Sequence, residues 1–62
     1  MTWREKANGE WVSDDYTITR DHNYNHLLTH TVTGPIRKYR LLWGAQREAE
    51  RRAGYIQQEN ML

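Results

Sequence analysis

The character of the sequence changes at Gly34-Pro35, and this change constrains the fold more than any other feature. Before it, β-favouring residues alternate in polarity, as in Tyr16-Thr17-Ile18-Thr19, which is typical of a strand with one buried face. After Leu42, small and apolar residues recur at the three- and four-residue steps of one helical face, at Ala45, Ala49, Ala53 and Ile56. The sequence predicts an α+β fold: a three-stranded antiparallel β-sheet packed against one C-terminal α-helix.

Turn signals divide the first part of the chain into strands. Ala7-Asn8-Gly9 and Asp21-His22-Asn23 are rich in turn-forming residues, and Gly34-Pro35 marks a further break. We expect strands at about 10–20, 24–33 and 36–40, a helix at about 42–56 and a frayed tail at 57–62. Ser13-Asp14-Asp15 interrupts the first strand, so Trp11 belongs either to a separate short extension or to the far side of a bulge.

The register of the second strand is open. One alternative turns Tyr24, His26 and Leu28 inward. Leu27 and Thr29 then face outward, and a slip by one residue reverses every assignment.

The third strand and the helix carry two further expectations. Ile36 and Tyr39 have opposite parity, so a regular strand cannot turn both towards one face. In the helix, the alanines allow close packing on the sheet, Leu42 and Trp43 fill the flank at one end and Ile56 fills it at the other. Glu48 is placed to pair with Arg52, Gly54 is expected to weaken or end the helix, and no N-capping side chain is present near Leu41.

Length and composition limit the chain to one small domain, residues 1–62. A chain of 62 residues without phenylalanine must draw much of its buried apolar area from three tryptophans and four tyrosines. It has no cysteine, so neither disulfides nor a thiolate metal site support the fold, which favours a reducing compartment. No apolar run approaches the length of a membrane span or a signal peptide. We expect a cytoplasmic protein that does not bind membranes.

Two groups of residues resemble a metal or catalytic site, but the predicted structure does not support either. His22, His26 and His30 are spaced by four, but four residues of a strand cover about 13 Å, too far for three ligands of one metal ion. Ser13 beside Asp14-Asp15 lacks a base and an oxyanion donor at a recognisable spacing, and is interpreted as a turn. We expect no metal, no cofactor and no enzymatic activity.

Charge is distributed unevenly along the chain. The net charge is +1, yet residues 1–34 hold three basic against five acidic residues, and residues 35–55 hold six basic against two acidic residues. Arg37, Lys38 and Arg40 have no acidic neighbour in sequence, whereas Glu48 and Glu50 interleave with the arginines of the helix. The helical charges favour a solvated surface, and the basic third strand is a candidate phosphate-binding segment.

The order of these elements resembles a known architecture. The resemblance covers nearly the whole chain and is carried by Trp11, Tyr16-Thr17-Ile18, Leu27-Leu28, Gly34, Ile36, Tyr39, Leu42 and the stretch from Ala45 to Ala53. The predicted arrangement is similar to the three-stranded sheet plus helix of integrase arm-binding and plant AP2-type DNA-binding domains. In its short length, the chain also resembles the product of a phage or mobile-element reading frame.

In those families the exposed sheet face enters the major groove while the helix packs behind it. The resemblance implies the nucleic-acid-binding residues Thr17, Thr19, Arg20, Thr29, Arg37, Lys38 and Arg40. Such domains usually carry more arginine and lysine on their first two strands, whereas this chain has Asp14, Asp15 and Asp21 there.

Two functions follow as hypotheses. The first is binding of double-stranded DNA through the exposed sheet face and the basic third strand. The alternative is a protein–protein interaction module, such as a phage-encoded inhibitor or adaptor of a host protein, because the net charge is near neutral, Trp and Tyr are abundant, and Asp14-Asp15 forms an acidic patch apart from the basic one. The open edges of so small a sheet predict a monomer or a weak homodimer.

Overall fold

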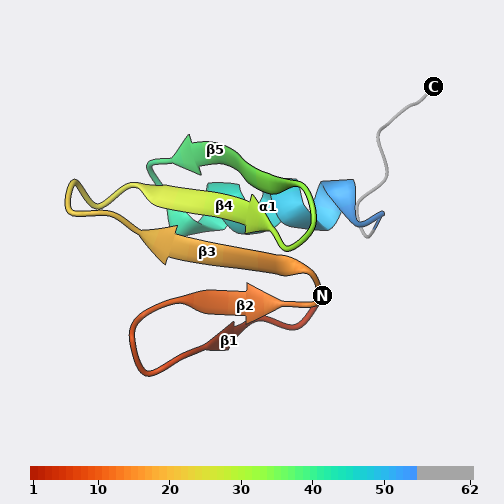
Figure 1. Ribbon diagram of the computed structural model, residues 1–62, viewed down its shortest axis with the longest axis horizontal. Coiled ribbons are helices and arrows are strands. Elements are labelled where there is room, and N and C mark those ends of the chain that lie inside the picture. The colour runs from red at the N-terminus through yellow and green to blue at the C-terminus, as the bar shows by residue number, and fades with distance from the viewer. Residues whose placement is uncertain (55–62) are drawn as a thin grey trace.

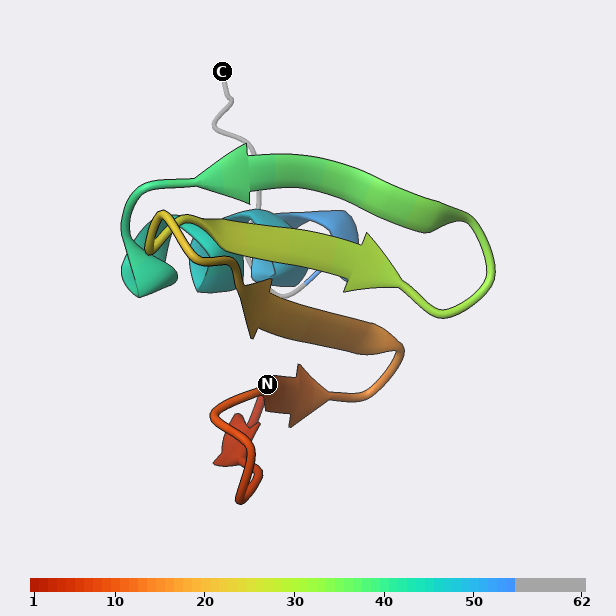
Figure 2. The same cartoon turned by 60° about the vertical axis from the view of Figure 1, so that its left-hand side comes forward.

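Five strands and one helix form a sheet with a single helical layer. The computed structural model describes residues 1–54, in the order β1 (Arg4–Glu5), β2 (Trp11–Ser13), β3 (Tyr16–Arg20), β4 (His26–His30), β5 (Gly34–Tyr39) and α1 (Leu42–Arg52). All neighbouring strands are antiparallel and follow one another in sequence order across the sheet (Figure 1). The helix packs against β3, β4 and β5 on one face (Figure 2). The predicted α+β class is confirmed, but the predicted number of three strands is wrong.

The additional strands come from the part of the chain predicted as one strand, 10–20, and from the residues before it. Ser13 pairs with Tyr16, so Asp14 and Asp15 are a two-residue turn between β2 and β3, and Asp14 has a φ of 51°. The Ala7-Asn8-Gly9 turn joins β1 to β2, with a hydrogen bond of 2.7 Å from the Lys6 amide to the Glu10 carbonyl. Trp11 therefore lies on a separate short strand, one of the two alternatives.

A bulge in β5 resolves the parity conflict between Ile36 and Tyr39. Leu28 pairs with Arg37 and Thr29 pairs with Pro35, so β5 contains one extra residue at Ile36. Both Ile36 and Tyr39 consequently pack against the core. The strand begins at Gly34, whose φ of 90° favours glycine, and ends before Arg40, so the predicted bounds 36–40 are shifted.

The second predicted strand, 24–33, is shortened at both ends. Its inward and outward assignments hold within β4, because Leu28 is completely buried and Leu27 and Thr29 lie on the opposite face. The inward assignment of Tyr24 is wrong: this residue lies in the β3–β4 loop with a φ of 63° and is 72% exposed. The turn residues 31–33 connect β4 to β5.

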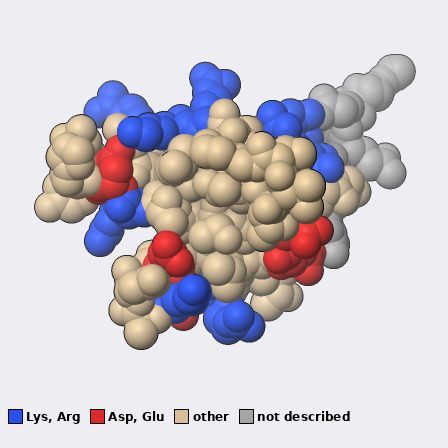
Figure 3. Space-filling view, viewed as in Figure 1, with Lys and Arg blue, Asp and Glu red and all other residues tan. Residues whose placement is uncertain are grey.

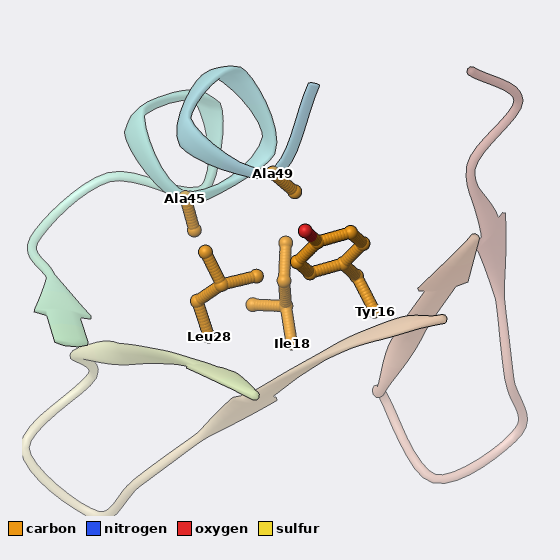
Figure 4. Close-up of a cluster of buried hydrophobic side chains, with 5 residues drawn as sticks. All are labelled: Tyr16, Ile18, Leu28, Ala45 and Ala49. Carbon is orange, nitrogen blue, oxygen red and sulfur yellow. The ribbon is translucent and has the colours of Figure 1, made fainter. Parts of the chain in front are cut away.

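The core lies between the sheet and α1. It consists of Tyr16, Ile18 and Leu28 from the sheet and Ala45 and Ala49 from the helix (Figure 4). Ile18 and Leu28 are the largest side chains with almost no exposed surface, and burying each contributes about 1.5–3 kcal/mol. Because the two alanines add little bulk, the helix backbone can approach the sheet closely. Aromatic residues contribute mainly at the margin, where Trp3, Trp11 and Tyr39 are partly buried.

The helix begins and ends without side-chain caps of its own. Leu41 is extended and makes no capping hydrogen bond, as the sequence predicted. The helix ends at Arg52, because Gly54 adopts a φ of 88° and its amide bonds to the Arg51 carbonyl at 3.1 Å. The predicted extension therefore fails at 53–54, while its end at 56, the Ile56 contact and the tail 57–62 lie outside the described residues.

Two expectations about the helix surface have opposite outcomes. Trp43 does not fill the flank of the core, since this residue is 66% exposed, whereas Leu42 does pack there. Glu48 pairs with Arg52 as predicted, at 2.8 Å between Oε2 and Nε. A hydrogen bond from Arg51 and then one from Arg52 lower the pKa of Glu48.

Candidate nucleic-acid interface

Among residues 1–54, no element covers the face of the sheet opposite the helix. The strand register defines the side chains of this face. Tyr16, Ile18 and Leu28 point towards α1 (Figure 4), so the residues that alternate with them point away. The register arranges these outward residues in two rows. One row contains Arg4, Val12, Thr17, Thr29 and Pro35, and the other contains Thr19, Leu27 and Lys38. We call these eight residues the open face.

Four of the seven predicted site residues meet on the open face. Thr17 and Thr29 are direct cross-strand partners, and Thr19 and Lys38 both pair with Leu27, which lies between them. The strand interiors position these side chains, because their neighbours in sequence are anchored in the core. Three threonines and one lysine are thus held on a single face.

The other three predicted residues lie elsewhere. Arg20 belongs to the row that includes His26 and Tyr39, on the side of the helix, and its guanidinium lies 5.6 Å from the centre of the Tyr24 ring. Arg37 is opposite Leu28 at the outer strand, with its guanidinium 5.6 Å from the centre of the Tyr39 ring.

Arg40 follows the end of β5 and is exposed. Arg37 therefore lies in the row of Leu28, on the side of the helix, and Arg40 lies beyond the end of β5, so neither belongs to the rows of the open face.

Arg4 and Val12 were missed as site residues by sequence reasoning. Arg4 lies on β1 and pairs with Val12, which pairs with Thr17. The Ala7-Asn8-Gly9 turn was the available signal, because a turn there allows the residues before it to fold back beside β2. The result is a basic side chain at the β1 edge of the open face, across the sheet from Lys38.

The acidic residues that distinguish this chain from the DNA-binding domains it resembles lie outside the open face. Asp14 and Asp15 form the β2–β3 turn, Asp21 lies in the β3–β4 loop, and Glu5 pairs with Trp11 on the side of the helix. Figure 3 shows the open face with uncharged residues in the middle and charged residues around the margin. The strand residues of this face are thus neutral or basic.

Lys38 is held in place by Asp21. The Lys38 Nζ lies 3.1 Å from Asp21 Oδ2, while Asp21 Oδ1 accepts hydrogen bonds of 2.9 Å from the backbone amides of Asn23 and Asn25. The hydrogen bond from the Asn25 amide, followed by the one from Lys38, lowers the pKa of Asp21. This pair reduces the free positive charge of Lys38. Within residues 1–54, the basic side chains that form no ion pair with a carboxylate are Arg4, Arg20, Arg37, Arg40 and Arg47.

His30 and His26 make local contacts at the two ends of β4. His30 Nδ1 accepts a hydrogen bond of 3.1 Å from the Val32 amide, and its ring packs edge-on against Tyr16 with centroids 4.9 Å apart. His26 lies at the other end of β4, and Ser13 is buried beside the Asp14-Asp15 turn. Within residues 1–54, no group of three His, Cys, Asp or Glu side chains is arranged to hold a metal ion.

Comparisons with known proteins give this chain no relatives to reason from. A scan against protein-family models, a search of curated proteins and a search of solved structures each found no match. Over the described part of the chain, no helix combines the length and the apolar character needed to cross a membrane.

Proposed function

We propose that this protein binds double-stranded DNA through the open face of its sheet. The observation that carries the proposal is the sorting of charge: eight acidic residues are present in the chain, yet none lies in the two rows of the open face, which contain Arg4 and Lys38. A surface that approaches phosphates must avoid carboxylates, because like charges at short distance oppose binding.

The arrangement gives each group a role. Arg4 at the β1 edge and Lys38 at the β5 edge, with Arg40 just beyond the end of β5, would contact phosphates on either side of the bound groove. The threonines between them supply hydroxyl groups that donate to or accept from base edges. The helix supports the sheet from behind and leaves this face free.

Fluorescence anisotropy of a labelled random-sequence duplex, titrated at low and moderate salt, tests this function. We expect affinity that falls steeply with salt, and a log–log salt slope reduced by about 0.9 for each phosphate contact removed by Arg4→Ala or Arg40→Ala. Arg47→Ala is the matched control, because it removes the same charge from α1, where the guanidinium lies over Trp43.

Two results would contradict the proposal. Absence of binding at low salt would remove DNA as the partner. A larger loss from Arg47→Ala than from Arg4→Ala and Arg40→Ala together would move the binding surface to the helix.

A second candidate function is protein binding, which one surface feature favours. Leu41 and Trp43 are 67% and 66% exposed at the start of α1, and Arg47 covers the Trp43 ring at 5.6 Å from its centre. Tryptophan, tyrosine and arginine are enriched at the energetic centre of protein interfaces, and this surface combines two of them. If this surface binds a host protein, Trp43→Ala will abolish the retention of a specific lysate protein on the immobilised chain, while Tyr24→Ala, which removes an equally exposed aromatic ring from a loop, will not.

A further inference from the structure

The centre of the open face is built from side chains that end in methyl groups. Val12, Thr17, Thr29, Thr19 and Leu27 occupy it, all half-buried, with the cationic residues only at the ends of the two rows. None of these five carries a guanidinium, an ammonium or a carboxamide. The centre therefore offers apolar contact and single hydroxyl groups, and no pair of donors or acceptors on one side chain.

Proteins read different bases in duplex DNA either by paired hydrogen bonds from one side chain or by apolar contact. Guanine is usually read by two hydrogen bonds from Arg or Lys, and adenine by two from Asn or Gln, whereas the C5 methyl group of thymine is read by apolar contact. A surface made of threonine, valine and leucine is suited to contact with the thymine methyl group and unsuited to the paired hydrogen bonds that read guanine and adenine.

We propose that the open face recognises thymine methyl groups in the major groove and so favours A·T-rich DNA. This inference rests on the proposed function and adds the base that the surface prefers. Uracil lacks the methyl group, so the same contacts would also disfavour duplexes in which uracil replaces thymine.

The spacing of the two rows sets the size of the recognised site. Thr17 and Thr29 share one row, and Thr19 and Leu27 lie two residues further along the same strands. Two strand residues span about 7 Å, which matches about two base-pair steps of 3.4 Å. The four central side chains can thus contact methyl groups on about two or three adjacent base pairs.

Three duplexes of equal length separate the inference from the proposed function. An alternating A·T duplex, the same duplex with deoxyuridine in place of thymidine, and a G·C duplex are titrated at one salt concentration. We expect the thymine duplex to bind most tightly and each lost methyl contact to weaken binding about fourfold, the value for removing one methyl group from an apolar contact. Replacing cytosine by 5-methylcytosine in the G·C duplex should strengthen binding, because it adds a methyl group at the C5 position of the pyrimidine.

Conservative variants locate the contact on the protein. Thr29→Ser keeps the hydroxyl group and removes the methyl group, so it should weaken binding to the thymine duplex more than binding to the uracil duplex and reduce the preference for thymine over uracil. Thr33→Ser is the matched control, because Thr33 lies in the exposed β4–β5 turn, outside the open face. Circular dichroism confirms that both variants are folded.

The outcomes distinguish the two proposals. Equal binding of all duplexes would overturn the thymine preference and leave DNA binding in place, as would an unchanged preference in Thr29→Ser. Failure of every duplex to bind at low salt would overturn both.

Discussion

At the scale of single residues, Asp21 connects three parts of the structure. Its backbone carbonyl accepts the Tyr24 amide, its side chain accepts the amides of Asn23 and Asn25, and it pairs with Lys38 on β5. A carboxylate that receives hydrogen bonds from backbone amides and a lysine is more stable in its charged form than it is in the unfolded chain. The loop and the β5 edge of the open face are therefore held together by one ionised side chain.

This arrangement predicts how stability depends on pH. The pKa of Asp21 is lowered in the folded state, so its contribution is complete above the unfolded-state pKa of about 3.9 and is lost as the pH falls through the folded-state value. Asp21→Asn keeps a side-chain oxygen that can accept from the backbone amides and removes the charge. This variant should lower the urea midpoint at neutral pH. The difference from the wild type should disappear at a pH below the folded-state pKa. Urea unfolding followed by tryptophan fluorescence measures both.

Asp15→Asn is the control for net charge, because Asp15 lies in the β2–β3 turn and takes no part in the Lys38 pair. A destabilisation of Asp21→Asn that persisted unchanged into acid would contradict the ionic role. It would assign the effect to the geometry of the loop instead.

At the scale of elements, the periodicity of the sequence predicted the buried faces of strands and helix, which depend on local pattern. It missed the turn between β2 and β3, which depends on how the strands pair. The alternation around Ile18 and the alanine spacing of α1 both identified buried faces, because a face must repeat with the period of its element. The turn at Asp14-Asp15 was interpreted as an interruption of one strand, since aspartate at a positive φ is not distinguishable in sequence from aspartate at a bulge.

The candidate site shows the same division. Parity alone places Thr17 and Thr19 on one face, whereas the side taken by Thr29 depended on a register that the sequence left open. The structure pairs Thr17 with Thr29 and brings all three threonines together with Lys38. Arg37 and Lys38 are neighbours, so an extended strand turns them to opposite sides, and the bulge at Ile36 decides which side each takes. That bulge arises from the fit between β4, β5 and the core, and no local pattern specifies it.

At the scale of the whole molecule, the open edges of the sheet determine whether two copies can associate. The β1 edge is only two residues long. The longer β5 edge combines a proline at Pro35, a bulge at Ile36 and exposed positive charge at Arg37 and Lys38. Prolines, bulges and cations on an edge strand each oppose pairing with another strand. Two β5 edges would also bring like charges together.

We therefore predict that the protein is a monomer in solution and that the β5 edge maintains this state. Sedimentation velocity should give a single monomeric species for the wild type. The double variant Pro35→Val, Arg37→Val restores a backbone donor and removes one charge, and should produce dimers at the same concentration. Arg47→Val, which removes the same charge and adds the same side chain on α1, should remain monomeric. A wild type that is already dimeric, or a double variant that stays monomeric, would show that features other than Pro35 and Arg37 control association. Because the double variant and Arg47→Val lose the same charge, a difference between these two variants cannot come from net charge.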